Sequence, residues 1–262
     1  MVNTSHAPQP RTAPRGASAS GRQGGYFLLE IALAMVLLGV LFVGVLQSQS
    51  LLAQYRYSAF VNGTRALTSN MSAYLNTRGR WPGDCNRDGL LDHEFLDVAT
   101  LNAVDLYDYI VPTSLTAAAS GATYAASNVC PTSTLVPFDN VNVPFNELKQ
   151  AGLLPSGQPS RVSAAHSLGG HAYLGTLTIN TVTNADLLEE RFNAIVLTGV
   201  PIAAARLLAV AIDGFDGSAA NLHRVRRSDD LGSFAPLWTA SGETDEARIT
   251  VVVLFDRVPP SL

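Results

Sequence analysis

The sequence has few charged residues, few cysteines and none of the common nucleotide-binding or hydrolase motifs. Charged residues make up only 15% of the 262 positions, and there are two cysteines. Two cysteines cannot by themselves supply the usual four-ligand zinc site. No G-x-S-x-G elbow, phosphate-binding G-x-x-x-x-G-K loop or dinucleotide fingerprint occurs. Because spacing assigns no nucleophile with a base and an orienting group, we expect a protein that is not an enzyme.

The few charges are unevenly distributed. The whole chain has a formal net charge of −4, from 17 basic and 21 acidic residues. The first 25 residues hold three arginines (Arg11, Arg15 and Arg22) and no acid, which leaves 14 basic against 21 acidic residues and a net charge of −7 for the remainder. An acidic main part argues against broad nucleic-acid binding.

One long apolar segment dominates the N-terminal part. It runs from Tyr26 to Leu46 and contains a single charged residue, Glu30. At a rise of about 1.5 Å per residue, a helix of this length spans roughly 30 Å, the thickness of a bilayer core. The arginines that precede it predict a cytoplasmic N-terminus. A carboxylate at the centre of such a segment costs on the order of 2.5–3.5 kcal/mol, and somewhat less near an end, so we expect Glu30 to have a partner or a function.

The residues around Gly25 resemble the processing site of type IV prepilins and type II secretion pseudopilins, a class III prepilin signal. Gly25 is followed by Tyr-Phe-Leu-Leu-Glu and the apolar run, although the family usually has Phe where this chain has Tyr26. The resemblance implies that prepilin peptidase removes a leader of residues 1–25 and that Tyr26 is then methylated. It also implies that Glu30 pairs with the N-terminal amine of a neighbouring subunit during assembly. A plain signal anchor and a cleaved secretory signal are the alternatives.

Helical spacing continues beyond the membrane segment. We expect residues 26–46 to form the transmembrane and assembly helix and residues 47–78 its amphipathic continuation, with a globular domain over residues 79–262. Gly79 and Pro82 follow the periodic pattern and end the helix. The apolar positions of the continuation are Leu51, Leu52, Tyr55, Ala59, Leu67, Met71, Tyr74 and Leu75.

Residues 84–95 read as the start of a calcium loop of the EF-hand type. The pattern is D-x-N-x-D-G-x-x-D, with Gly89 at the sharp turn, and oxygen ligands at alternate positions converge when the chain curls around the ion. The twelfth position is Phe95, where a bidentate glutamate belongs. A surface turn without an ion is the alternative reading. The predicted Ca²⁺ ligands are Asp84, Asn86, Asp88, Leu90 (through its carbonyl), Asp92 and Glu94.

The two cysteines, Cys85 and Cys130, form a disulfide if the globular domain lies in an oxidising compartment. The bond would stabilise the fold by ~4 kcal/mol on the chain-entropy model. Two buried free thiols are the alternative.

The rest of the chain predicts short elements. We expect a short helix at 144–152, strands at 172–182 and 194–200, a brief helix at 185–191 and a helix from Pro201 to about Val210. A strand is expected at 221–227, and the clearest strand covers 248–255. A long helix followed by short strands and helices indicates an α+β, pilin-like fold with a mainly antiparallel sheet, the long helix packed on the globular domain.

One basic cluster, formed by Arg224, Arg226 and Arg227, is a candidate for contact with anions or DNA. Alternation places Arg224 and Arg226 on one face of a strand, where they could meet phosphate groups. A solvated or salt-bridged face is the alternative interpretation.

The resemblance implies a structural subunit, a minor pilin or pseudopilin, of a type IV pilus or a type II secretion filament. Its partners would be other pilin subunits, prepilin peptidase and the inner membrane, which it would cross once, with the domain in the periplasm until assembly. A DNA- or surface-binding adhesin on a pilin stem is one alternative. A membrane-anchored periplasmic enzyme is another.

Overall fold

The structure is a computed structural model. It describes residues 24–95, 101, 106, 129–131, 135–183, 186–214, 217–230 and 233–256. The chain divides into two compact units, residues 1–52 and 53–262. Its elements are α1 (Gly24–Arg78), α2 (Val143–Gln150), α3 (Ser160–Ala164), β1 (Ala172–Thr183), β2 (Asp186–Pro201), α4 (Ile202–Asp213), β3 (Val225–Asp230), β4 (Ser233–Phe234) and β5 (Arg248–Leu254).

Helix α1 is 55 residues long and unbroken. It ends where the sequence predicts an end, because Gly79 adopts a left-handed conformation with φ of 73° and its N–H donates to the carbonyl of Leu75. Gly63, in the second half of the helix, does not interrupt it.

The second half of α1 buries one face in the folded unit. Phe60, Met71 and Tyr74 are each no more than 4% exposed and belong to the main core. Met71 and Tyr74 were expected there. Upstream the predicted apolar stripe is wrong, because Leu52 and Tyr55 are 52% and 72% exposed.

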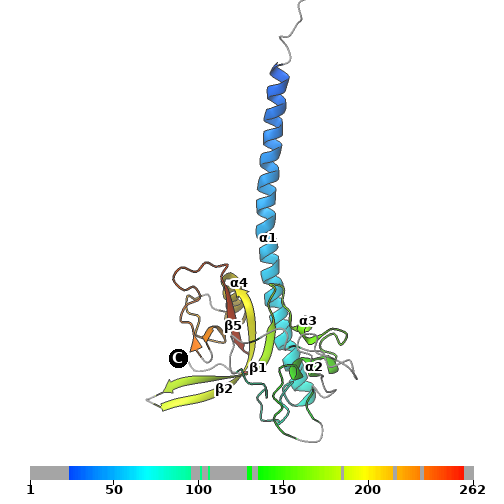
Figure 1. Ribbon diagram of the computed structural model, residues 1–262, viewed down its shortest axis with the longest axis vertical. Helices are drawn as coiled ribbons and strands as arrows, with labels where there is room; N and C mark the ends of the chain where they lie inside the picture. Colours follow the sequence, from blue (N-terminus) through cyan, green and yellow to red (C-terminus); the bar gives the residue numbers. More distant parts are fainter. Residues whose placement is uncertain are drawn as a thin grey trace, which may run out of the picture. The chain divides into compact units, whose positions relative to one another are not determined.

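The folded unit contains a five-stranded sheet in the order β1-β2-β5-β3-β4, and every paired strand is antiparallel (Figure 1). The coarse α+β prediction is therefore confirmed. Strand β2 pairs with β1 from Asp186 to Leu197 but with β5 only from Ala194 onward. The outer ends of β1 and β2 consequently project from the sheet as a two-stranded ribbon (Figure 1).

The last strand occupies the middle of the sheet. Val251, Val252, Val253 and Leu254 of β5 are essentially unexposed. A strand that is buried on both faces needs a continuous apolar run rather than alternation, which is why this segment is the clearest strand in the sequence.

Two local predictions need correction. The brief helix predicted at 185–191 is wrong, because described residues 186–191 belong to β2 and pair with β1. The segment Asp-Leu-Leu-Glu-Glu-Arg has good helix formers, but cross-strand pairing outweighs weak local propensity. Strand β3 starts four residues later than expected and runs to Asp230. Helices α2 and α4 lie where they were predicted.

The exposed Gly63 provides a test of the helix. A Cβ at Gly63 would meet no atom within 4 Å, so Gly63→Ala should stabilise the folded unit by about 0.5–1 kcal/mol and raise Tm by roughly 1–4 °C. The measurement is thermal unfolding of the full chain in detergent, followed by circular dichroism.

Gly79 is the matched control, since a Cβ there is equally free of contacts but φ is 73°. Gly79→Ala should lower Tm, because the left-handed conformation costs a residue with a side chain about 1–2 kcal/mol. Equal shifts of the same sign in both variants would contradict the helix end described above.

Candidate functional site

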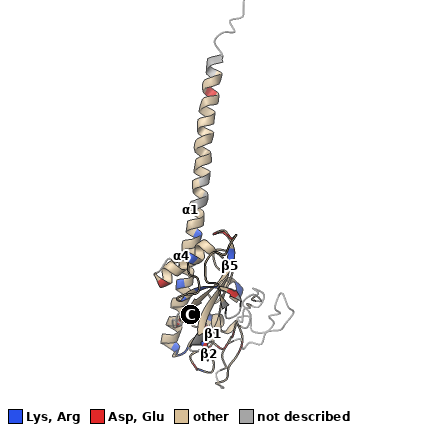
Figure 2. Cartoon of the chain, turned by 90° about the vertical axis from the view of Figure 1, so that its left-hand side faces the viewer, with Lys and Arg blue, Asp and Glu red and all other residues tan. Residues whose placement is uncertain are grey.

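Helix α1 contains one stretch, Phe27–Val45, that is long and apolar enough to cross a membrane, and none of it is buried within the chain. Figure 2 shows this part of α1 almost entirely in the colour of uncharged residues. Glu30 lies in its second turn and is exposed among leucine and isoleucine side chains. An apolar surface of this size needs a lipid or protein environment.

The predicted processing site falls at the edge of the described chain. Gly25 and Tyr26 belong to α1, but nothing is described of the Tyr26 side chain. The predicted leader lies outside the described residues up to position 23.

The acidic loop after α1 is curled by hydrogen bonds between its own residues. The Asp84 carboxylate accepts a bond across the loop from the N–H of Gly89 at 3.2 Å. The Asn86 side-chain oxygen accepts from the N–H of Asp88 at 3.1 Å, and Asp88 accepts from the N–H of Leu90 at 2.8 Å. The predicted ligands at the first, third, fifth and seventh positions therefore lie on one tightly curled segment.

Asp84 is the most buried carboxylate of this loop, with 1% of the residue exposed. Burial raises the pKa of Asp84, and the neighbouring charges of Asp88 and Asp92 raise it further, while the N–H groups of Gly89 and Arg87 act in the opposite direction. One of its oxygens, Oδ1, is buried and has no hydrogen-bond partner. An unpartnered carboxylate oxygen in the interior is costly and calls for an explanation.

Two side chains, Asp92 and Asn193, fix the loop to the rest of the folded unit. Asp92 accepts bonds from the N–H groups of Cys85 at 3.2 Å and Phe138 at 2.6 Å. Asn193, on β2, donates to the carbonyl of Gly89 and accepts from the N–H of Leu91, both at 2.8 Å. Spacing in the sequence gave no signal for Asn193, because it lies 104 residues from Gly89.

Glu94 does not join the predicted ligand set. Its carboxylate accepts a bond from the Thr178 hydroxyl at 2.8 Å and lies 3.5 Å from the Arg191 guanidinium. A backbone bridge to Thr176 orients Glu94 toward strands β1 and β2. The prediction that Glu94 is a calcium ligand is therefore wrong. Among the described residues, no three His, Cys, Asp or Glu side chains are grouped closely enough to hold a metal ion by themselves.

The disulfide prediction is confirmed, since Cys85 and Cys130 are bonded with their Cα atoms 5.0 Å apart. The bond lies beside a buried ion pair. Arg80 donates to both oxygens of Glu147, at 2.8 and 2.5 Å, and lies 3.4 Å from the Cys130 sulfur. Glu147 also accepts from the N–H of Gly83 at 2.8 Å.

This ion pair connects the end of α1 to helix α2. The Arg80 and Glu147 side chains are 15% and 3% exposed. Burial, with a further contribution from Glu147, raises the pKa of the adjacent Tyr74 on α1. Sequence analysis missed this arrangement, because the two partners are 67 residues apart and neither belongs to a recognisable motif.

The arginine cluster is not an exposed surface, and the prediction that it forms one is wrong. Arg226 is completely buried over the ring of Phe234, and burial lowers its pKa to about 10. Arg227 is 8% exposed and forms an ion pair with Glu243 at 2.6 Å. Arg224 donates to the carbonyls of Leu254 and Phe255. Arg226 and Arg227 of β3, and Arg224 just before it, contact neighbouring segments of the fold, which alternation along a strand does not predict.

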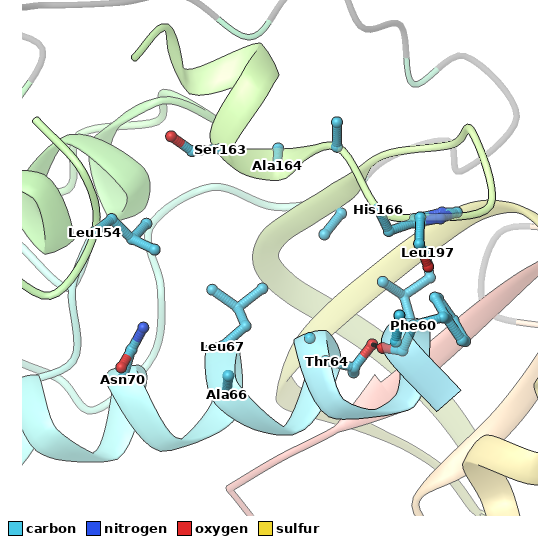
Figure 3. A pocket seen from close by; sticks show the side chains of 15 residues that line it. Phe60, Thr64, Ala66, Leu67, Asn70, Leu154, Ser163, Ala164, His166 and Leu197 are labelled. Carbon is cyan, nitrogen blue, oxygen red and sulfur yellow. Dashed lines mark hydrogen bonds between the residues drawn. The ribbon is translucent and has the colours of Figure 1, made fainter. Parts of the chain in front are cut away.

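A cavity of about 270 Å³ lies beside α1 in the folded unit. Phe60, Thr64 and Leu67 of α1 line one side, and Leu154 and the segment 163–167 line the other (Figure 3). None of its lining side chains is Asp, Glu, Lys or Arg. It therefore offers neither an ionic anchor for a ligand nor a carboxylate for acid–base chemistry.

His166, at the edge of this cavity, is held as a neutral ring. Nδ1 accepts from the N–H of Leu168 at 3.3 Å, and Nε2 donates to the carbonyl of Thr198 at 2.9 Å. Burial lowers the pKa of His166, with smaller contributions from His171 and Arg248, although the bond to Thr198 opposes this shift. Its ring also meets Phe60 edge to face, with centroids 5.0 Å apart.

Comparison with known proteins gave no significant match to any family model, to any curated protein or to any solved structure.

The buried ion pair predicts a large loss of stability when one partner is removed. Glu147→Gln should destabilise the folded unit by about 3 kcal/mol, because Arg80 is then left buried without a countercharge. Tm of the full chain should fall by roughly 6–12 °C. Glu246→Gln, at an exposed carboxylate, is the control and should change Tm little. A Glu147→Gln variant as stable as that control would contradict the importance given to this pair.

His166 predicts a loss of stability in mild acid. Since its pKa is lowered on folding, the unfolded chain takes up the proton first, so stability is full above the ordinary value of about 6.5 and falls as the pH drops below it. Between about pH 7 and 5, His166→Gln should therefore show a shallower fall of Tm than the wild-type chain. His223→Asn, at an exposed histidine, should keep the wild-type slope. Identical slopes for all three proteins would contradict the interpretation.

Proposed function

We propose that this protein is a structural subunit of a type IV pilin-like filament, a minor pilin or pseudopilin that is held in the membrane before assembly. The observation that carries the proposal is the combination of an unburied apolar helix, Phe27–Val45, with one carboxylate, Glu30, in its second turn. Gly25 precedes this stretch at the spacing of a prepilin processing site. In the proposal, prepilin peptidase cuts after Gly25 and the new N-terminus is methylated.

The physical argument for this proposal is the free energy needed to place the Glu30 carboxylate in an apolar environment. A carboxylate in a hydrocarbon or apolar protein environment is tolerated when an opposite charge meets it. Cleavage before Tyr26 creates an ammonium group that did not exist in the precursor. The ammonium group of a neighbouring subunit can neutralise Glu30. Assembly would therefore remove the free-energy cost of the unpaired carboxylate.

The folded unit is consistent with a location outside the cytoplasm. A disulfide between Cys85 and Cys130 forms and persists in oxidising compartments. The arginine-containing segment before the apolar helix favours the opposite, cytoplasmic side. The proposal therefore places the N-terminus in the cytoplasm and the folded unit in the periplasm, and later on the filament surface.

The alternative functions have less support. DNA binding by the arginine cluster would require exposed cations, whereas Arg226 and Arg227 are buried. An enzyme would require reactive groups free to act in a cavity, whereas His166, the titratable residue in the lining of the cavity beside α1, is bonded to the backbone through both ring nitrogens. We therefore include no catalytic activity in the proposal.

The proposal predicts that Glu30→Ala abolishes recruitment into filaments. In the host species, the variant should be lost from sheared filaments by at least about tenfold, the change that corresponds to ~1.4 kcal/mol of pairing energy. Its amount in the membrane should be unchanged, because the apolar helix remains. The measurement is immunoblotting of the filament and membrane fractions. Glu30→Asp, which keeps the charge, should be recruited better than Glu30→Ala.

Glu94→Ala is the matched control, because it removes a carboxylate from the folded unit instead of the helix. Recruitment of Glu30→Ala at the wild-type level would reject the proposal. Mass spectrometry of the wild-type protein extracted from membranes provides a second readout, since the mature chain should begin at N-methylated Tyr26. An intact leader in cells with an active prepilin peptidase would also count against it.

A further inference from the structure

Three carboxylates lie within electrostatic range of one another in the loop after α1. The negative charges of Asp88 and Asp92 both act on the carboxylate of Asp84, and the charge of Asp88 also acts on that of Asp92. Like charges so arranged repel one another, and a loop that keeps them together without compensation is destabilised.

The described residues offer this group little compensating charge. Arg80 lies close enough to act on Asp92, but its guanidinium is already bonded to both oxygens of Glu147. Arg87 belongs to the loop, yet its side chain is exposed. Among the described residues, the negative charge of the loop is therefore only partly balanced.

The buried carboxylate of Asp84 is aimed into this loop. Its Oδ2 accepts from the N–H of Gly89, five residues further along. Its Oδ1 is buried and has no partner, in a residue that is only 1% exposed. An oxygen in that position carries a full desolvation cost that a hydrogen bond or a cation would remove.

We propose that the loop Asp84–Asp92 binds one calcium ion. Asp84 supplies its unpartnered oxygen, and Asn86 and Asp88 supply oxygens that each accept one hydrogen bond and keep a further lone pair. The backbone carbonyl of Leu90 contributes a fourth donor. Asp92 acts through a bridging water, because one of its oxygens already accepts two N–H groups. Two of the donors are an amide oxygen and a carbonyl, so the site does not depend on three grouped acidic side chains.

The loop is held in this form before any ion binds. The Asn193 side chain forms hydrogen bonds with Gly89 and Leu91, on either side of Leu90. Neither bond uses the Leu90 carbonyl. The disulfide at Cys85 fixes the second residue of the loop. A preformed loop loses less conformational entropy on binding than a flexible one.

Calcium fits this donor set better than magnesium or a transition metal. All the donors are oxygens, their arrangement is irregular, and calcium accepts six to eight oxygen ligands in flexible geometry. Affinity should be low, because Phe95 occupies the position of the bidentate glutamate and Glu94 is bonded to Thr178. We expect a Kd of about 10⁻⁴–10⁻³ M, in the range of extracellular calcium modules.

The test is thermal unfolding of the full chain in detergent, with its disulfide intact, in chelator and in millimolar calcium chloride. In 1 mM calcium chloride, Tm of the wild-type chain should rise by about 1–6 °C. Asp84→Asn should abolish this rise. In chelator Asp84→Asn should unfold at or above the wild-type Tm, because the substitution removes a buried negative charge and keeps an oxygen that can accept from Gly89.

Asp88→Asn, at an exposed position of the loop, should also lose most of the calcium effect and provides a second variant if Asp84→Asn does not fold. Asp245→Asn removes an exposed carboxylate outside the loop and should keep the full effect. A wild-type Tm that does not change with calcium would overturn the proposal. An equal rise in the wild-type chain and both loop variants would overturn it too, since calcium would then act elsewhere. A magnesium effect as large as that of calcium would overturn the choice of ion.

Discussion

The folded unit depends on the buried ion pair between Arg80 and Glu147. Arg80 follows the end of α1 by two residues, and Glu147 lies on α2, so the pair connects the long helix to the rest of the unit. Glu147 also accepts from the N–H of Gly83, and Arg80 donates to the carbonyl of Asp84 at 3.2 Å. An ion pair with these additional bonds is well satisfied, which is the condition under which a buried pair is tolerated.

The acidic loop starts directly at this ion pair. Asp84 is held from one side by Arg80 through its carbonyl, while the neighbouring Cys85 is joined to Cys130. Asn193 of β2 holds the far side of the loop. Helix, disulfide and sheet thus fix a short segment whose own charges repel one another. Such a segment keeps its shape because covalent and hydrogen bonds oppose the repulsion, and a bound cation would remove the repulsion itself.

One continuous helix, α1, has a different distribution of apolar side chains in each of the two units. In the stretch Phe27–Val45 the side chains are apolar and exposed all round, which suits lipid or the helices of other subunits. Further along, the same helix buries only one face, with Phe60 and Met71 in the core and Arg56 and Asn62 exposed. The change from an apolar surface to a one-sided pattern fits a change of surroundings from lipid to water, and the proposed assembly would account for Glu30.

Much of the framework was determined by the sequence alone, because it depends on local periodicity and composition. The long helix follows from the apolar run and from Gly79, the central strand from the run of valines before Leu254, and the disulfide partner from there being only one other cysteine. The curl of the acidic loop likewise follows from Asp, Asn and Gly at fixed spacing.

Only the tertiary structure decided which polar groups are buried and what they meet. The partnership of Arg80 with Glu147 and the clamp by Asn193 join residues far apart in the chain, and no spacing rule encodes them. Arg226 is buried because Phe234 and adjacent segments cover strand β3, and residues 186–191 form a strand because β1 pairs with them. Local propensity is worth tenths of a kcal/mol per residue, whereas burial and long-range pairing are worth several, so packing prevails wherever they conflict.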